Sequence, residues 1–314
     1  MEINLKVNLL KLLMYDDFKK SGIIHKIVQQ KVKDNYNKFE SALDIAEFIE
    51  DNIKKLTKFD QCNPLKAGVA FPTGISINDV AAHFTPSKDN NPKINDNDLV
   101  KIDFGVHING CISDGAISIC KNGKYDDLIN ISKGATELAI KNAGVDVILG
   151  ELGGIIQEYI ESKEIEIDGK NINIKSIYDL SGHNIAPYVI HVNKAVPNIK
   201  IPYFERMEEG EVFAIETFPT TGNGSIMNDT ECNHYMIENK HINKINSVIK
   251  KNDKIRKIYN IRGTLAFCPR WFDFDIPDSS FITKYPVLKT VDGGIVAQYE
   301  KSIYIGTKKV DILN

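Results

Sequence analysis

Apolar residues recur at helical spacing over residues 9–56, which predicts a helical N-terminal region. Leu43, Ala46, Ile49 and Ile53 fall on one side of such a helix and form its expected buried stripe. A Ser–Gly pair at positions 21 and 22 predicts a break that divides this region into a short helix and a longer one. Two more helices are expected over residues 128–143 and 147–161.

Alternating apolar and polar positions predict the strands. Residues 100–119 form the clearest hairpin, because two alternating runs flank an Asn–Gly dipeptide suited to a tight turn with two positive φ angles. Further strands are expected over 199–203, 212–218 and 295–305, whereas 71–86 has turn formers at both ends and is expected to be irregular. Residues 222–285 return to mixed helical periodicity and predict an insert. Helices followed by strands, twice over, indicate an α+β fold.

Composition narrows the function. A chain of 314 residues permits one large domain or a domain with an insert. With 39 Lys and Arg against 42 Asp and Glu, the net charge of −3 offers no basic excess for a phosphate backbone, so no nucleic acid partner is expected. No apolar run approaches the roughly 20 residues that span a bilayer, and the N-terminus lacks a cleavage site. We therefore expect no membrane partner and a cytoplasmic location. The odd number of cysteines, 5 at scattered spacings, is typical of reduced thiols.

The hairpin brings two aspartates together. An Asn–Gly turn places Asp103 opposite Ala116 and Asp114 opposite Gly105, so both carboxylates project from one face as diagonal neighbours. Diagonal Cβ atoms lie roughly 7 Å apart or less. Two bare carboxylates this close repel each other unless a cation or a shared proton lies between them, which favours a metal. The alternative is a solvated polar face.

Other acids and histidines strengthen the metal interpretation. Glu216 in VFAIETF and Glu300 in IVAQYEKSIYI stand inside apolar strand-like runs, where acids are depleted. His183 is expected in a glycine-preceded loop, SGHNIAPYVIH, and His191 comes eight residues later. Each histidine alone is more often structural. Four carboxylates with one imidazole favour a hard two-metal site suited to Mn, Fe or Co, and no thiolate zinc motif is present.

These motifs resemble the type 2 methionine aminopeptidases, metallopeptidases of the pita-bread fold. The resemblance covers nearly the whole chain and rests on AGVAFPTGISINDVAAHFTP, KIDFGVHINGCISDGA, GHNIAPYVIH, EEGEVFAIETF and GTLAFCPRW. It implies an α+β pita-bread fold with pseudo-two-fold symmetry. The catalytic domain would comprise residues 1–222 and 286–314, with a type 2 helical subdomain inserted at 223–285.

The resemblance also implies a site. Two divalent ions (Co, Mn, Fe or possibly Zn) would be held by Asp103, Asp114, His183, Glu216 and Glu300. His83, His191 and Glu216 would be catalytic, and mere packing is the alternative for the two histidines. The implied substrate-binding residues are Phe71, His83, Ile190, His191, His234, Ala266 and Tyr285. The implied activity removes the N-terminal methionine of nascent chains when the next residue is small. Ribosome association and fumagillin-like inhibitors are further implied partners.

Some residues depart from the family pattern. Lys301 stands where the family usually has His, and Asn184 and Ala186 replace its commoner residues, which bears on metal preference. Two alternative functions are weighed against the methionine aminopeptidase interpretation. A proline-directed peptidase of this fold is expected to carry a large N-terminal domain, whereas only 70 residues precede FPTG. A metal-free binding homologue is expected to have lost ligands, whereas all five ligand positions are retained.

Overall fold

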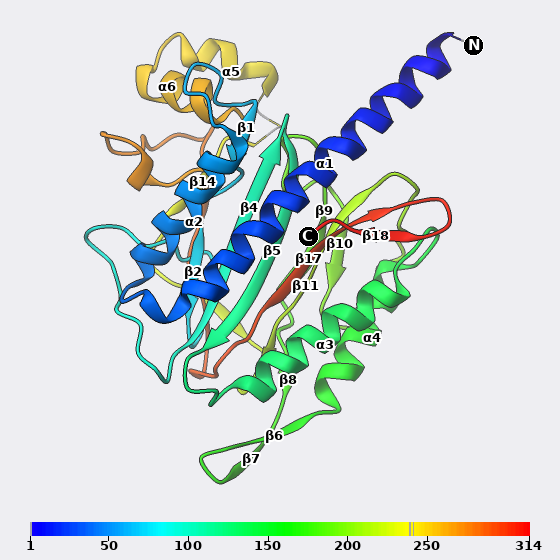
Figure 1. The fold of residues 1–314 in the computed structure, drawn as a ribbon, viewed down its shortest axis with the longest axis vertical. Helices are drawn as coiled ribbons and strands as arrows, with labels where there is room; N and C mark the ends of the chain where they lie inside the picture. Colours follow the sequence, from blue (N-terminus) through cyan, green and yellow to red (C-terminus); the bar gives the residue numbers. More distant parts are fainter. Residues whose placement is uncertain (1, 239, 241) are drawn as a thin grey trace.

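Two halves of similar construction make up the body of the protein (Figure 1). The computed structural model describes residues 2–238, 240 and 242–314, with side chains from residue 12 onward except at 242. In the first half, α1 (Glu2–Asn35), η1 (Tyr36–Lys38) and α2 (Ala42–Thr57) accompany a sheet of β1 (Ala67–Val69), β2 (Gly74–Ile77), β4 (Leu99–Ile108) and β5 (Cys111–Cys120). In the second, α3 (Asp126–Asn142) and α4 (Leu149–Glu161) cover a sheet ordered β10 (Ala195–Pro197), β9 (Ser181–Ile185), β11 (Val212–Thr217), β17 (Tyr299–Ile305) and β18 (Val310–Ile312). This repetition of two helices and a sheet confirms the predicted α+β class.

The two sheets meet along β5 and β17, where side-chain hydroxyls replace a backbone ladder. Ser302 Oγ accepts from the amide of Asp114 at 2.8 Å and donates to the carbonyl of the same residue at 2.9 Å. Ser118 Oγ does the same for Gln298, at 2.9 and 2.8 Å. Each serine thus satisfies a buried donor and a buried acceptor of the facing strand, which joins the halves without a continuous sheet.

The β4–β5 hairpin has the predicted register. Asn109 (φ 49°) and Gly110 (φ 81°) form the turn with the positive angles that the dipeptide predicted. Asp103 pairs with Ala116 and Gly105 with Asp114, so the two carboxylates share the inner face.

Four local predictions were wrong. Helix α1 runs through positions 21 and 22 without a break, because Ser21 Oγ bonds the carbonyl of Phe18 within the helix and Gly22 lets the helix approach Leu313. A Cβ on Gly22 would lie 2.2 Å from the Leu313 oxygen. Residues 71–86 contain β2 and β3 (Val80–Ala82), and no strand forms over 199–203. Of the expected stripe on α2, Leu43 is only partly buried.

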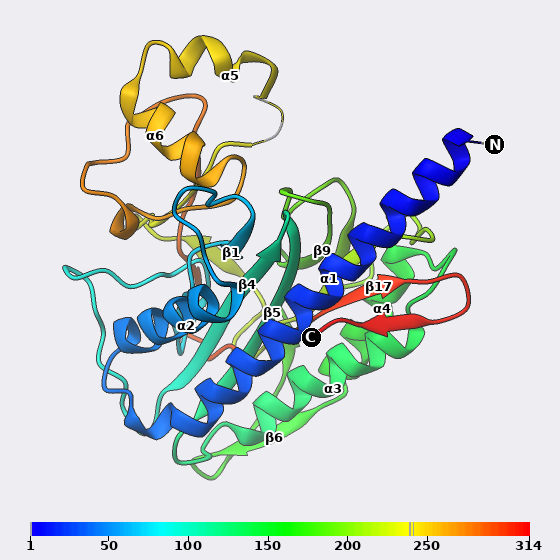
Figure 2. The same cartoon turned by 45° about the horizontal axis from the view of Figure 1, so that its top comes forward.

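The helical insert stands above the first half (Figure 2). It holds α5 (Ile242–Ile249), α6 (Asp253–Arg262) and η3 (Pro269–Trp271), and its apolar cluster includes Ile245, Ile258 and Phe267. The chain enters and leaves it through β14 (His234–Met236) and β15 (Thr283–Tyr285), which pair with each other. Below them, β13 (Ile226–Asn228) pairs with β16 (Leu288–Thr290), which also pairs with β3. The exact boundary at 223–285 stays a prediction.

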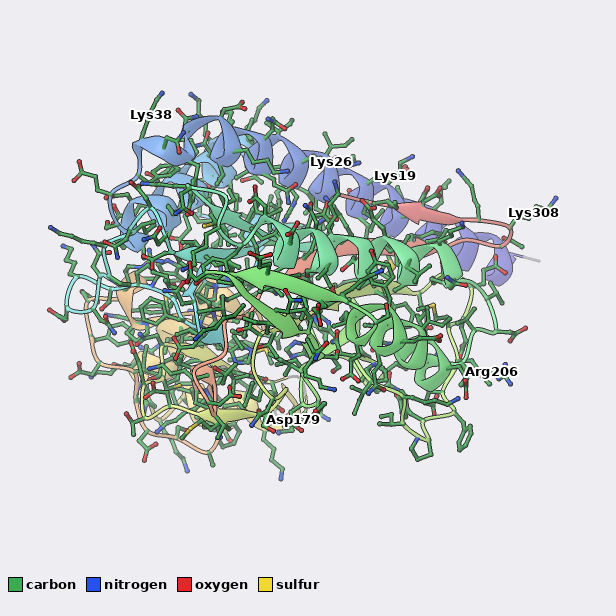
Figure 3. All side chains as sticks on the ribbon, turned by 90° about the horizontal axis from the view of Figure 1, so that it is seen from below. Lys19, Lys26, Lys38, Asp179, Arg206 and Lys308 are labelled. Atoms are coloured by element: carbon green, nitrogen blue, oxygen red, sulfur yellow. The ribbon has the colours of Figure 1, made fainter. Side chains whose placement is uncertain are left out.

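The remaining strands are short. β6 (Glu164–Ile167) and β7 (Lys170–Asn173) form a projecting hairpin, and β8 (Lys175–Ser176) pairs with β12 (Pro219–Thr220). Charged side chains such as Lys19, Lys26 and Lys308 point outward from the periphery, away from the centre of the sheets (Figure 3). None of the helices in the described ranges has the length and apolar content of a membrane span.

Candidate metal centre

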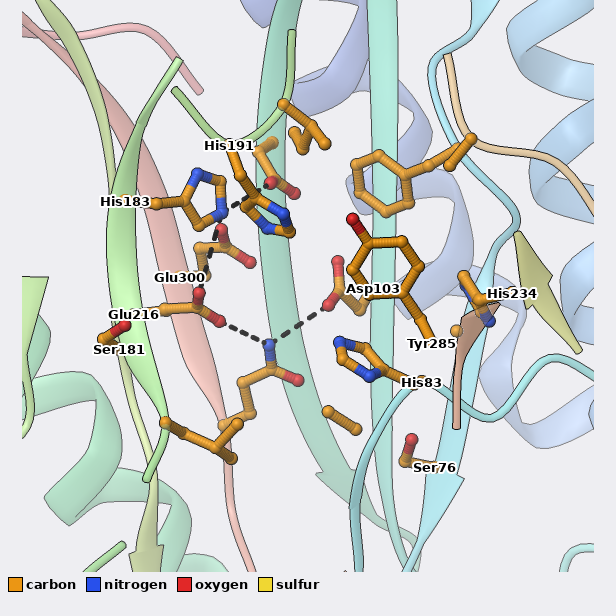
Figure 4. A pocket seen from close by; sticks show the side chains of 18 of the residues that line it. Ser76, His83, Asp103, Ser181, His183, His191, Glu216, His234, Tyr285 and Glu300 are labelled. Carbon is orange, nitrogen blue, oxygen red and sulfur yellow. Dashed lines mark hydrogen bonds and ion pairs between the residues drawn. The ribbon is translucent and has the colours of Figure 1, made fainter. Parts of the chain in front are cut away.

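The five predicted ligands line one cavity, and each comes from a different strand. Figure 4 shows Asp103, His183, Glu216 and Glu300 pointing into the space between the two sheets. The first sheet contributes Asp103 on β4 and Asp114 on β5, and the second contributes His183 on β9, Glu216 on β11 and Glu300 on β17. Glu216 and Glu300 lie directly opposite each other in the β11–β17 ladder. Because like charges opposite each other destabilise a sheet pair, this arrangement calls for a positive counterpart.

The side-chain distances describe a compact cluster. His183 Nε2 lies 3.6 Å from Asp114 Oδ2 and 3.8 Å from Glu216 Oε1. One ligand atom from each of Asp114, His183 and Glu300 falls within 4.8 Å of the others. These are separations that a cation coordinated by several of the groups would bridge.

The side chains of the cluster fit a divalent metal, because several of their carboxylate oxygens are buried and lack a hydrogen-bond partner. Asp103 Oδ1, Asp114 Oδ1 and both carboxylate oxygens of Glu300 are buried without a hydrogen-bond partner. In the described part of the chain, no lysine or arginine forms an ion pair with these acids. Buried polar atoms are almost always satisfied, so four orphaned carboxylate oxygens in one cluster point to an oxygen-seeking cation.

Burial shifts the proton equilibria of the cluster. It raises the pKa of Asp103 to about 6 and, with the charge of Asp103 added, holds the pKa of Glu216 well above its usual range. Burial and neighbouring carboxylates do the same to the pKa of Asp114 and of Glu300. Burial also holds the pKa of His183 well below 6.5, so its imidazole is neutral and able to act as a ligand. A bound cation favours the charged carboxylates and reverses their upward shifts.

Two further histidines and a tyrosine border the cluster. His191 packs edge-on against His183 with ring centroids 4.3 Å apart, and Tyr285 lies 5.9 Å from His83 and 6.2 Å from His191, centroid to centroid. Burial lowers the pKa of both histidines, that of His191 to about 4, so they are neutral at pH 7. His83 has a left-handed backbone, φ 66°, a strained conformation that occurs preferentially at functional sites.

A largely apolar chamber adjoins the acids. The predicted substrate-binding residues all line the same cavity as the five ligands, and so do Pro72, Leu180, Phe218 and Met236. His234 is placed directly opposite Tyr285 by the β14–β15 ladder, and its Nε2 donates to the carbonyl of Pro72 at 3.1 Å. The cavity thus has acidic and imidazole side chains at its base and apolar walls that suit an apolar side chain of a substrate.

Gln298 is the main residue that sequence reasoning missed. Its amide donates to Asp103 Oδ2 and to Glu216 Oε2, both at 3.2 Å, and so links acids from the two halves. Its position two residues before Glu300 on the same chain segment was the available signal, because alternate residues of a strand share a face.

Residues that depart from the family pattern lie beside the centre. Asn184 Oδ1 accepts from the amides of Asn193 and Lys194 and thereby ties down the loop that carries His191. Lys301 does not line the cavity, because it alternates with Glu300 on β17. His183, expected in a loop, lies on strand β9.

Comparison with known proteins identifies the family. The model of metallopeptidase family M24 matches residues 16–253. The chain is 40% identical over 313 residues to methionine aminopeptidase 2 of Yarrowia lipolytica, covering 96% of this chain and 66% of that protein. It is 37% identical over 312 residues to methionine aminopeptidase 2 of Clavispora lusitaniae, covering 96% and 71%. The chain thus spans about two thirds of the length of these curated relatives.

Solved structures share the fold. Methionine aminopeptidase of Thermotoga maritima superposes with a TM-score of 0.65 at 19% identity, covering 95% of each chain. Prolidase of Pyrococcus furiosus gives 0.56 at 16% identity, covering 98% of this chain and 67% of the other. These likenesses confirm the pita-bread architecture. The family match and the sequence relatives show that the chain belongs to metallopeptidase family M24 and, within it, to the type 2 methionine aminopeptidases.

Proposed function

We propose that this protein removes the N-terminal methionine from polypeptides whose second residue is small, using two divalent metal ions. The observation that carries the proposal is the cluster of four carboxylates, three of them buried, with one neutral imidazole at the floor of an apolar chamber. The methionine aminopeptidase 2 relatives support the choice of substrate.

Asp103, Asp114, His183, Glu216 and Glu300 would hold the metals. The metals would activate a water molecule for attack and stabilise the oxyanion that develops on the carbonyl. The unpartnered oxygens of Asp103, Asp114 and Glu300 support this assignment, because each of these carboxylates has an oxygen free for an ion. The identity and number of the ions belong to the proposal.

Glu216 is assigned to proton transfer. Its Oε2 accepts from Gln298, which fixes the orientation of the carboxylate and directs Oε1 toward His183 and the centre. From that position it takes a proton from the attacking water and delivers it to the leaving amine.

The two neutral histidines bind the substrate amide. His83 Nδ1 donates to the carbonyl of Pro286 at 3.2 Å, which leaves Nε2 with a lone pair able to accept from the scissile N–H. His191 donates to the carbonyl oxygen as its charge develops. The methionine side chain occupies the chamber formed by Phe71, Ile190, His234, Ala266 and Tyr285.

The test compares peptides and metals on one preparation. Met-Ala-Ser and Ala-Pro-Ser are incubated with purified protein, and free amino acids are measured by mass spectrometry before chelation, after chelation, and after adding Mn, Co, Fe or Zn. We expect methionine release that chelation abolishes and metal restores. Faster cleavage before proline would favour a prolidase-like enzyme, and an inactive protein that takes up no metal would favour a binding homologue. Ribosome association and a cytoplasmic location stay predictions.

A further inference from the structure

Arg262 is a buried cation at the C-terminal end of α6, outside the cluster of ligands. Its side chain is buried, and its guanidinium lies 4.8 Å from the centre of the Trp271 ring. Among the residues that the structure describes, no carboxylate forms an ion pair with Arg262. Burial lowers its pKa to about 10, which still leaves it charged at pH 7.

Backbone carbonyls from two different parts of the chain receive its hydrogen bonds. Nη2 donates to the carbonyl of Ala70 at 2.8 Å and to that of Ala266 at 2.8 Å, and Nε donates to Ala266 at 3.1 Å. Ala70 belongs to the first half of the body, whereas Ala266 belongs to the predicted insert. Arg262 therefore links the insert to the body through one planar side chain.

Both carbonyls belong to walls of the chamber. Ala70 immediately precedes Phe71, which lines the chamber, and Ala266 itself lines it from the insert. The wall formed by Ala70 and Phe71 is held against β4. The amide of Ala70 donates to the carbonyl of Gly105 at 2.9 Å, and the Phe71 ring packs so closely on Gly105 that a Cβ there would lie 2.3 Å from it. The distance between the walls therefore depends on how the Ala266 segment is held.

The chemistry of arginine suits this link. A guanidinium presents several donors in a rigid plane, so it can hold two carbonyl oxygens in a fixed relation. An aliphatic side chain would pack on Trp271 without desolvating a charge, and burying a charge is costly unless its hydrogen bonds are satisfied. The hydrogen bonds to the carbonyls of Ala70 and Ala266 satisfy the buried guanidinium, and they hold both walls of the chamber in a fixed relation.

We propose that Arg262 is a positioning residue that sets the width of the methionine chamber and so helps select an unbranched side chain over a branched one. This inference rests on the proposed function, since it assigns the chamber to the first residue of the substrate. Arg262 touches neither the ligands nor the reacting atoms, so its effect falls on binding and selectivity.

The experiment uses the metal-loaded protein with Arg262→Met and Arg262→Lys. Arg256→Met is the matched control, because Arg256 is on the same helix, is half exposed, and forms an ion pair with the surface residue Asp253. For peptides beginning with Met, norleucine or Leu and continuing Ala-Ser, KM and kcat are measured separately. Binding of free L-methionine is measured by calorimetry, and metal content by mass spectrometry.

With Arg262→Met we expect KM for the methionyl peptide to rise about tenfold, within the range that one hydrophobic pocket contact provides, with kcat changed less than about twofold. The preference for Met over Leu falls by a similar factor, and metal content is unchanged. Arg262→Lys gives intermediate values, because an ammonium can bond the carbonyls without fixing their relation. Arg256→Met behaves as wild type.

An unchanged KM and unchanged Met preference in an active, folded Arg262→Met protein would overturn the inference and leave the proposed function intact. A fall in kcat alone would also overturn it, as would failure of both Arg262 variants to fold. If wild type cleaves no methionyl peptide, the proposed function fails. Calorimetry then tests the chamber separately, and L-methionine binding that Arg262→Met does not weaken would overturn the inference.

Discussion

Nδ1 of His83 and the carbonyl oxygen of Pro286 lie 3.2 Å apart, and this hydrogen bond fixes the proton of the imidazole on Nδ1. Nε2 is then an unprotonated nitrogen in a ring that is neutral at pH 7. A neutral imidazole held beside an electrophile is a competent nucleophile.

We therefore predict that a fumagillin-like epoxide alkylates His83. Nε2 forms a bond to an epoxide carbon as the C–O bond breaks; the alkoxide takes a proton from water, and the alkylated imidazolium loses its Nδ1 proton to solvent. Peptide mapping by mass spectrometry should locate one adduct on the peptide containing AAHFTP. His83→Asn should abolish the adduct while His191→Asn retains it, and an adduct on His191 or His234 would contradict the assignment.

Replacing Asp114 by Asn should remove metal without unfolding the protein. The substitution keeps the shape of the side chain and removes one charge from a cluster of four acids, so the metal-free variant should be at least as resistant to urea as metal-free wild type. Metal per chain should fall by at least one ion, and methionine release should fall by roughly a hundredfold or more, comparable to the loss of a general catalyst. Unchanged metal content would remove Asp114 from the ligand set.

His25 should make stability depend on pH. Its Nε2 donates to the carbonyls of Phe104 at 2.9 Å and Gly115 at 3.2 Å, and burial lowers its pKa to about 3. Below pH 6.5 the His25 side chain is protonated in the unfolded chain but stays neutral in the folded chain. The free energy of unfolding therefore falls as the pH drops from 6.5 toward 3.

The measurement for His25 compares wild type with His25→Gln, which retains a donor and does not titrate. The difference in their unfolding free energies in urea should shift by about 2 kcal/mol between pH 7 and pH 5, to the disadvantage of wild type. Other titrating groups are common to both proteins and cancel. A difference that is constant over this range would show that His25 charges freely in the folded state.

Glu50 should be needed to hold the insert on α2. Its carboxylate accepts from Arg270 at 2.7 and 3.0 Å and from the indole of Trp271 at 2.8 Å, and it is buried. Glu50→Ala leaves the arginine charge uncompensated, so the unfolding free energy should fall by about 3–5 kcal/mol. Asp51→Ala is the matched control, since Asp51 is exposed beside Lys54 and should change stability by less than about 1 kcal/mol. Equal effects of the two substitutions in denaturant titrations would contradict the role of Glu50.

The parts of the site that sequence predicted are those that local rules govern. The Asn–Gly turn fixes a ladder whose alternation is strict, so the relation between Asp103 and Asp114 follows by counting. Glu216 and Glu300 are detectable because acids seldom stand in buried strands. The family resemblance supplied the remaining assignments, and the structure brings all of those residues into one cavity.

Features that depend on distant contacts were not predictable in the same way. The Ser–Gly pair in α1 resembles a helix break. Its glycine is instead required by the close approach of Leu313, nearly three hundred residues away in the sequence. The bonds from Arg262 to Ala70 and from Arg270 to Glu50 also join segments far apart in sequence. No period or turn signal encodes such pairs, because the partner is set by packing.

The five proposed ligands come from five strands, and this distribution determines when a metal centre can form. Asp103 and Asp114 are brought together by a tight turn, so they meet early and locally. Glu300 reaches them only when β17 docks against β5, which closes a loop of nearly two hundred residues and makes this a slow, non-local step. During synthesis the hairpin emerges as a bare acidic pair. We therefore expect tight metal binding to follow folding of the whole body, and a partly synthesised chain to bind metal weakly.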